Sequence, residues 1–157
     1  MSGDQRSIDE DAADVGLVDA RGAAANKRRM QDIFSELSTG DAKPLIDSLA
    51  ENFAWTILGT TAWSRTYRGK QTVIEELFGP LFEQFATTYP NIAHRFIAED
   101  DYVVIQCQGE VTTRDGKPYN NTYCYVCCLA GGKLLELTEY LDTELLSKAL
   151  TAPEPKL

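Results

Sequence analysis

A glutamate near the end of the chain has the setting best suited to proton chemistry. In the segment Leu134–Leu141, strand alternation places Glu139 on the same face as Leu135 and Leu137. A carboxyl group that points into an apolar hollow loses hydration, which raises its pKa towards the range useful for proton transfer. The alternative is that Glu139 pairs with an Arg or Lys at the rim of the hollow. The pattern thus makes Glu139 a candidate acid–base group.

Two preceding segments carry further polar side chains. Asn121, Tyr123 and Tyr125 share one face of a predicted strand. A tyrosine can donate a hydrogen bond to a carbonyl or enolate oxygen while its ring packs on a flat ligand. The same rings would also suit an aromatic ladder that only fills the interior, so both roles stay open. On the strand before it, Gln108 and Glu110 share a face.

The only histidine and the cysteines favour structural roles. His94 alternates with Ile92 and Phe96, which favours a hydrogen-bonded core residue over a catalyst, and a lone histidine excludes a multi-histidine metal site. Cys124 and Cys127 form a C-x-x-C pattern, but residues three apart on a strand point to opposite faces. Buried free thiols are therefore predicted, with no metal site.

Helices are predicted before the strands. A helix from about Ala23 to Thr39 and a short helix capped by Asp41 come first, followed by a strand at Phe53–Ile57. A third helix starts after Gly69, and Gly79-Pro80 should kink it because proline removes a backbone hydrogen bond.

The remainder of the chain predicts an antiparallel meander and a last short helix. The meander strands are Ile92–Phe96, Tyr102–Val111, Tyr119–Leu129 and Leu134–Leu141, with turns at Asp115-Gly116 and Gly131-Gly132. A helix capped by Asp142 should follow from about Thr143 to Leu150. The fold class is therefore α+β, with the helices covering one face of an antiparallel sheet.

Composition indicates one globular domain of 157 residues, 43% hydrophobic, with a formal charge of −9. We expect a disordered acidic tail at 1–22, a domain at 23–150 and a loose C-terminus at 151–157. Because Lys and Arg are not clustered as a phosphate-binding surface requires, nucleic acid is excluded as a partner. The sequence has neither a secretory leader pattern nor an apolar stretch long enough to span a bilayer, which predicts a cytoplasmic protein with no membrane partner.

Several segments in order resemble a known family. The chain is similar to the SnoaL-like, ketosteroid-isomerase-like family of the nuclear-transport-factor-2-like superfamily in Trp55–Gly59, Tyr67–Lys70, Gly116–Tyr123, Gly132–Leu134 and Glu139–Thr143. This resemblance covers about Ala23 to Leu150. It implies a cystatin-like α+β barrel, in which a curved antiparallel sheet wraps around helices to form a conical pocket, and a homodimer.

The resemblance also implies roles for residues. Similar epoxide hydrolases and phenazine-biosynthesis proteins have a functional carboxylate at the position of Glu139. Gln106 and Gln108 stand where the epoxide hydrolases use Arg and Asp, which argues against epoxide opening. The expected catalytic residues are Glu139, Tyr123 and Gln108, and the expected ligand-binding residues are Trp55, Trp63, Tyr67, Phe82, Glu110, Asn121, Tyr125 and Leu137.

The leading hypothesis is an isomerase or cyclase that needs no cofactor and acts on a flat, mostly apolar carbonyl compound. Glu139 would transfer the proton, while Tyr123 and Gln108 would hold the carbonyl oxygen. The alternatives are a module that binds a hydrophobic or aromatic ligand without turnover, and a structural dimer whose pocket is filled by its own side chains.

Overall fold

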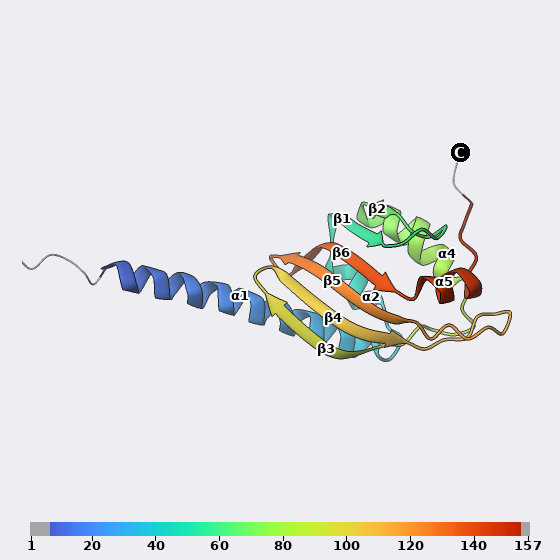
Figure 1. Ribbon diagram of the computed structural model, residues 1–157, viewed down its shortest axis with the longest axis horizontal. Coiled ribbons are helices and arrows are strands. Elements are labelled where there is room, and N and C mark those ends of the chain that lie inside the picture. The colour runs from blue at the N-terminus through green and yellow to red at the C-terminus, as the bar shows by residue number, and fades with distance from the viewer. Residues whose placement is uncertain (1–6, 155–157) are drawn as a thin grey trace, which may run out of the picture.

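The computed structural model describes residues 7–154, with side chains described from Gly22 onward. A curved, unclosed sheet of six strands in the order β2-β1-β6-β5-β4-β3 is combined with helices (Figure 1), which confirms the predicted α+β class. The elements are α1 (Ser7–Leu37), α2 (Lys43–Ser48), β1 (Leu49–Ile57), β2 (Thr66–Arg68), α3 (Lys70–Thr72), the π-helix η1 (Val73–Phe78), α4 (Gly79–Phe82), β3 (Asn91–Glu99), β4 (Tyr102–Gly109), β5 (Thr122–Ala130), β6 (Lys133–Leu141) and α5 (Thr143–Ala149).

The predicted meander is confirmed, and one strand pairing differs from a purely antiparallel sheet. Strands β3, β4, β5 and β6 pair antiparallel in sequence order. Strand β1, in contrast, runs parallel to β6, with Trp55 opposite Leu137 and Ile57 opposite Glu139. This pairing brings the N-terminal half of the domain against the last strand, beside Glu139.

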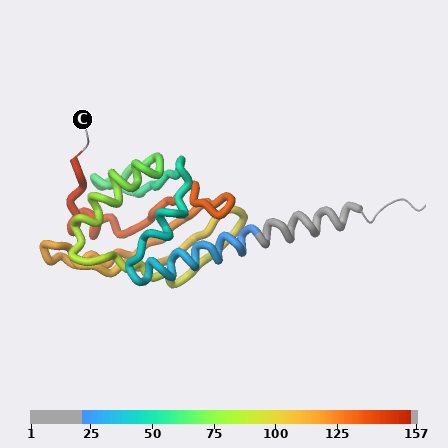
Figure 2. Tube along the Cα trace, turned by 180° about the vertical axis from the view of Figure 1, so that it is seen from behind, coloured from blue at the N-terminus to red at the C-terminus, as the bar shows by residue number. Residues whose placement is uncertain are grey.

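The helices lie on one side of the sheet and bury its apolar face. Met30, Ile33, Phe34 and Leu37 of α1 are buried, as their helical spacing predicts. The C-terminal part of α1 runs along β3 and β4 (Figure 2), and the ring of Phe34 meets Phe96 edge-on with centroids 5.9 Å apart.

The ends of the chain test the predicted boundaries only in part. Helix α1 begins at Ser7, ahead of the expected start near Ala23. Residues 1–6 and the side chains before Gly22 lie outside what the structure describes, so the acidic tail at 1–22 stays a prediction. Residues 155–157 lie outside it as well, so the loose end at 151–157 is not settled. None of the helices in the described part of the chain is long and apolar enough to cross a membrane.

At Gly79-Pro80, where a kink was predicted, the helix changes from π-helical to α-helical. Pro80 has no N–H for the usual bond to a carbonyl four residues earlier, and the turn before it is π-helical, with the Gly79 N–H donating to the Ile74 carbonyl. The wider turn buries the neighbours Leu77 and Phe78 together. Phe78 then stacks on Phe82 with centroids 5.4 Å apart. Both rings face the site described below.

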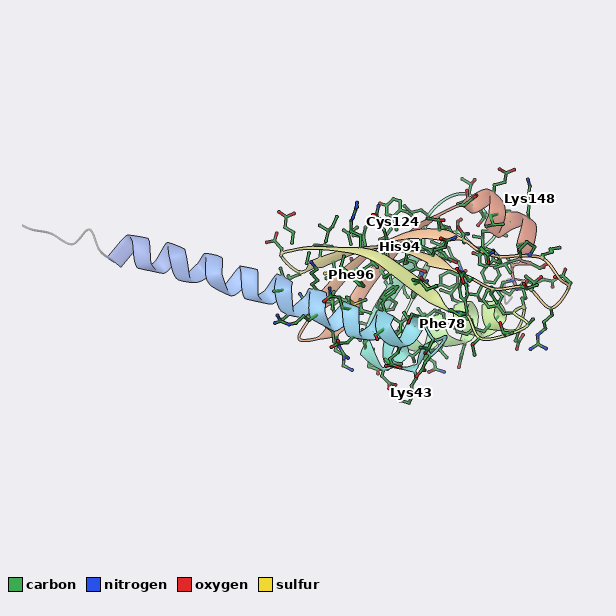
Figure 3. The ribbon with its side chains drawn as sticks, turned by 90° about the horizontal axis from the view of Figure 1, so that it is seen from below. Lys43, Phe78, His94, Phe96, Cys124 and Lys148 are labelled. Atoms are coloured by element: carbon green, nitrogen blue, oxygen red, sulfur yellow. The ribbon has the colours of Figure 1, made fainter. Side chains whose placement is uncertain are left out.

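The cysteines follow strand alternation, and the histidine does not. All four cysteines are free, with Cys127 on the buried side of β5 and Cys124 half-buried on the other side. Figure 3 shows Cys124 and Phe78 on opposite sides of the sheet. The prediction of a core histidine is wrong: His94 is exposed, because the pairing of β3 with β4 shifts register between Ala93 and Arg95.

Candidate active site

A narrow cavity of about 70 Å³ lies between the curved sheet and the helices. Its walls come from α1, α2, β1, η1, α4, β3, β5, β6 and α5, and most of the lining side chains are aromatic or aliphatic. Glu139 is the one charged residue among the described residues in this lining. We call this hollow the inner cavity.

Glu139 is buried in the inner cavity, with 7% of its surface exposed. It stands beside Leu137 on the inner face of β6, which confirms the apolar setting inferred from alternation. Burial raises the pKa of Glu139 to about 7, and a hydrogen bond from Trp55 opposes that rise. The other leucine assigned to this face is Leu134 rather than Leu135, because the β5–β6 pairing shifts register near that point.

Trp55 fixes the orientation of this carboxyl group. Its indole Nε1–H donates to Glu139 Oε2 at 2.7 Å. The indole is itself held edge-on by Phe78 and Tyr125, with centroids 5.3 and 5.8 Å away. Among the described residues, nothing donates a hydrogen bond to Oε1 of Glu139. One carboxyl oxygen is thus anchored, and the other is left for a partner in the cavity.

Three tyrosine hydroxyls form a hydrogen-bonded chain at the same cavity. Tyr123 donates to Tyr119 at 3.3 Å, and the hydroxyls of Tyr89 and Tyr123 are joined by a short hydrogen bond. Because a hydroxyl has one proton and Tyr123 gives its proton to Tyr119, Tyr89 must be the donor to Tyr123. The Tyr119 oxygen also accepts from Asn121 Nδ2 at 3.2 Å. Tyr119 therefore ends the chain, with its own proton uncommitted among the described residues.

The tyrosines are neutral donors at physiological pH. Burial raises the pKa of Tyr119 to about 12, and the hydrogen bonds that it accepts from Tyr123 and Asn121 oppose this rise. Burial also raises the pKa of Tyr89 and of Tyr123. Tyr119, whose proton is uncommitted among the described residues, can thus donate to an oxygen that becomes negative, while Tyr89 and Tyr123 act as neutral donors within the chain.

Two buried polar atoms in the cavity wall have no hydrogen-bond partner among the residues that the structure describes. They are the Trp63 Nε1 donor and the Asn91 Oδ1 acceptor. The amide nitrogen of Asn91 donates to the Tyr125 hydroxyl at 3.4 Å. Because an unmet buried polar atom costs free energy, each favours a ligand or water that supplies the missing partner.

The structure brings most of the predicted site residues together. The inner cavity is lined by Glu139, Tyr123, Trp55, Trp63, Phe82, Tyr125 and Leu137. Asn121 is buried behind the wall, where it holds Tyr119 and exchanges hydrogen bonds with the backbone of Asp142. Its part is to position Tyr119 and the start of α5.

Besides Asn121, three more predicted site residues do not line the inner cavity. Gln108 pairs with Thr122 on the outer side of the sheet, since Cys107 and Gly109 take the inner positions of β4. Glu110 is exposed beyond the end of that strand. Tyr67 is buried, but its hydroxyl donates to the Trp63 carbonyl, and its ring packs under Arg65 outside the cavity.

Sequence reasoning missed Tyr119, Tyr89 and Asn91. Tyr119 continues the alternation of Asn121 and Tyr123, so the pattern contained the signal. Tyr89 precedes β3 in a loop, and its place depends on Gly109: a Cβ on Gly109 would lie 2.0 Å from the Tyr89 hydroxyl oxygen. No local pattern in the sequence indicates that contact.

Replacing Gly109 with alanine is therefore expected to displace Tyr89 and to destabilise the protein by about 1–3 kcal/mol, the usual cost of overpacking. Urea unfolding measures this cost. In a Tyr89→Ala background the same substitution should cost far less, because the clashing ring is gone. An equal cost in both backgrounds would show that the contact between Gly109 and Tyr89 does not determine the effect.

Comparisons with known proteins agree with this architecture. The SnoaL-like domain profile matches residues 30–137. Among solved structures, Bal32a from a soil-derived mobile gene cassette superposes with a TM-score of 0.72 at 19% identity, covering 83% of this chain and 99% of that chain. A candidate SnoaL-like polyketide cyclase from Jannaschia sp. CCS1 gives 0.67 at 17% identity, with coverage of 84% and 95%.

A third solved structure contains a ligand. TerC, co-crystallised with polyporic acid, gives a TM-score of 0.66 at 16% identity, covering 79% of this chain and 96% of that chain. At these identities the likeness shows a shared fold only. The comparison with curated proteins found no match.

Proposed function

The chain belongs to the SnoaL-like family, and on that premise we propose that it is an isomerase or cyclase that moves a proton on a small carbonyl compound. The family has the fold of polyketide cyclases and isomerases, and the inner cavity supplies an acid–base group and hydrogen-bond donors. The observation that carries the proposal is Glu139, a buried carboxyl with a pKa near 7 in an apolar cavity lined by tyrosines.

The proposed reaction starts with Glu139 as its carboxylate. Oε1 removes a proton from the carbon next to the carbonyl group, and the electron pair of the broken C–H bond moves to the carbonyl oxygen to give an enolate. The protonated Glu139 then returns the proton to another carbon of the conjugated system, which completes an isomerisation. In a cyclase the enolate carbon would instead attack a second carbonyl of the same molecule, whose oxygen takes the proton. A pKa near 7 suits both directions of transfer.

Tyr119 is the proposed donor to the enolate oxygen. Tyr123 uses its proton within the chain of hydroxyls, whereas Tyr119 has a free proton and accepts two hydrogen bonds. Accepting hydrogen bonds polarises the Tyr119 O–H group, which makes it a stronger donor. The proposed role of Tyr123 is thus to support Tyr119 rather than to contact the ligand oxygen alone.

Deuterium exchange tests this proposal without knowledge of the natural substrate. Small cyclic ketones and enones in D₂O would be incubated with the protein, and exchange next to the carbonyl followed by NMR. We expect exchange above the buffer rate, rising with pH to half its maximum near pH 7, and a loss of about 100-fold in Glu139→Gln.

The matched control is Glu136→Gln, which removes an exposed carboxyl from the same strand. This variant should exchange at the wild-type rate. Equal rates in wild type and Glu139→Gln, or no exchange above buffer with any ketone, would contradict the proposal. Ligand binding that is indifferent to Glu139 would instead favour a binding module without turnover.

A structural role is the second candidate, and one observation favours it. The inner cavity of about 70 Å³ is small compared with an engineered protein cavity of about 150 Å³ that holds benzene. In a purely structural protein, aromatic side chains fill the hollow and no ligand enters. Small ketones would then leave the melting temperature unchanged in both wild type and Glu139→Gln.

The assembly and compartment that we propose are a homodimer in the cytoplasm. Support for the dimer comes from Ile97, Tyr102 and Tyr140, three large apolar side chains that are about half exposed in the sheet. Support for the compartment comes from the four cysteines, none of which forms a disulfide. Sedimentation at micromolar concentration, compared between wild type and Tyr140→Lys, tests the dimer.

A further inference from the structure

A second hollow of about 320 Å³ adjoins the inner cavity. The two share Ala42, Phe82 and Tyr89 as lining residues. Phe82 is 36% exposed, so part of the shared wall is in contact with solvent. We call this second hollow the vestibule.

Of the described residues that line the vestibule, Arg114 alone is charged. It is exposed, and within the described part of the chain no carboxylate forms an ion pair with it. The other lining residues are Gly, Ala, Thr, Phe and Tyr. The vestibule therefore offers one uncompensated positive charge on a protein whose formal net charge is −9.

The backbone holds Arg114 at this place. Its N–H donates to the Gln84 carbonyl at 2.8 Å, and the Ala86 N–H donates to the Thr112 carbonyl at 3.0 Å. These bonds fasten the turn that carries Arg114 to the segment after α4, which supplies Phe85 to the vestibule, while Phe82 comes from the end of α4 itself. The backbone of Arg114 is thus fixed beside the vestibule, and its side chain extends from that anchored turn.

The two volumes constrain what can bind. The inner cavity of about 70 Å³ accepts a group smaller than a benzene ring, since a cavity of about 150 Å³ is known to hold benzene. The vestibule of about 320 Å³, which shares three lining residues with the inner cavity, is the adjoining hollow with room for the rest of a larger ligand. A ligand that reaches Glu139 thus has a small head in the inner cavity and a tail beside Arg114.

We propose that the ligand of this site is an oxo acid, with its small carbonyl head beside Glu139 and its carboxylate held by Arg114 in the vestibule. A planar guanidinium binds a carboxylate through two parallel hydrogen bonds, which makes it selective for this group over an uncharged amide. The inference rests on the proposed function for the placement of the carbonyl head, and it adds the chemical class of the tail.

The test uses the intrinsic fluorescence of the protein. Both of its tryptophans, Trp55 and Trp63, line the inner cavity, so quenching reports a head group that has entered. The probes are straight-chain acids with a terminal acetyl head and alkyl chains of increasing length, each paired with its primary amide. Titrations compare wild type, Arg114→Gln and Glu139→Gln. Arg68→Gln, which removes an exposed arginine from β2, is the control of equal charge change.

We expect the wild type to bind the best acid about tenfold more tightly than its amide, with the preference weakening as salt is added. Arg114→Gln should lose this preference while its amide affinity stays unchanged, and Arg68→Gln should keep it. Acid and amide affinities that are equal in wild type, a preference that survives in Arg114→Gln, or no quenching by any probe would overturn the inference.

The same titrations separate this inference from the proposed reaction. Quenching without an acid preference, together with deuterium exchange that needs Glu139, would overturn the role of Arg114 and leave the proton chemistry standing. An acid preference that needs Arg114, together with no deuterium exchange in the wild type, would support the role of Arg114 and overturn the proposed proton chemistry.

Discussion

Replacing Glu139 with glutamine is expected to stabilise the protein at pH 8 by about 3 kcal/mol, even though it removes the proposed catalytic group. Burial raises the pKa of this carboxyl from 4.5 to about 7 in the folded state, and a shift of this size corresponds to about 3 kcal/mol. Glutamine occupies the same space, has no charge to desolvate, and can still accept the hydrogen bond from Trp55.

The sign of the pH dependence follows from where the proton is bound. Between pH 4.5 and about 7, the folded protein keeps the Glu139 proton while the unfolded chain has lost it. Rising pH therefore favours the unfolded chain, and the wild type loses stability through this window and not beyond it. In Glu139→Gln this loss should be absent, and the two proteins should be nearly equal in stability at pH 4.

Urea unfolding of both proteins across this pH range measures the effect. Glu136→Gln, with its exposed carboxyl on the same strand, should reproduce the wild-type profile. If Glu139→Gln lost stability with pH as steeply as the wild type, Glu139 would have an ordinary pKa in the folded state, and the basis for its acid–base role would be gone.

The second large effect is expected at Trp55. Alanine at this position should cost about 3–5 kcal/mol, because the indole packs edge-on against Phe53, Phe78 and Tyr125. It also removes the only donor to Glu139 found among the described residues, so the pKa of Glu139 should rise above 7. Urea unfolding of the alanine variant measures the total cost.

Phenylalanine at the same position separates packing from hydrogen bonding. Trp55→Phe keeps an aromatic ring but loses the Nε1 donor, so it should cost about 1–3 kcal/mol more at pH 8, where Glu139 is charged, than at pH 5. Trp63→Phe is the matched control, since Nε1 of Trp63 has no hydrogen-bond partner within the described part of the chain. A pH-independent cost for Trp55→Phe would mean that the indole does not stabilise the carboxylate.

The sequence was sufficient for the elements with strong periodicity. Alternation predicted that Tyr123 and Tyr125 share one face of β5 and that Glu139 lies on the apolar face of β6, and helical spacing predicted the buried stripe of α1. The family resemblance predicted that the tyrosines point into the pocket. These predictions succeeded because one face of each element must be apolar wherever it packs on a core.

The predictions failed at two kinds of place. In the first, one extra residue in a strand reverses which side chains face the core, and in the second, the contact joins residues that are distant in the sequence. Register shifts put Leu134 in place of Leu135 and left His94 exposed, and strand alternation alone contains no sign of either. Gln108 was assigned to the pocket by resemblance, although its own alternation with Cys107 left the choice of face open. The contact of Tyr89 with Gly109 depends on packing that only the fold creates.

Tyr89 lines both the inner cavity and the vestibule, and this shared position connects events in the two hollows. A bound molecule in the vestibule could accept the hydrogen bond that Tyr89 otherwise donates to Tyr123. The Tyr123 hydroxyl would then be less polarised, and Tyr119 would become a weaker hydrogen-bond donor. If the molecule instead donates to the Tyr89 oxygen, the polarisation increases along the three hydroxyls. The tail of a ligand would thereby adjust the reactivity of its own head, so that substrates with identical carbonyl groups would react at different rates.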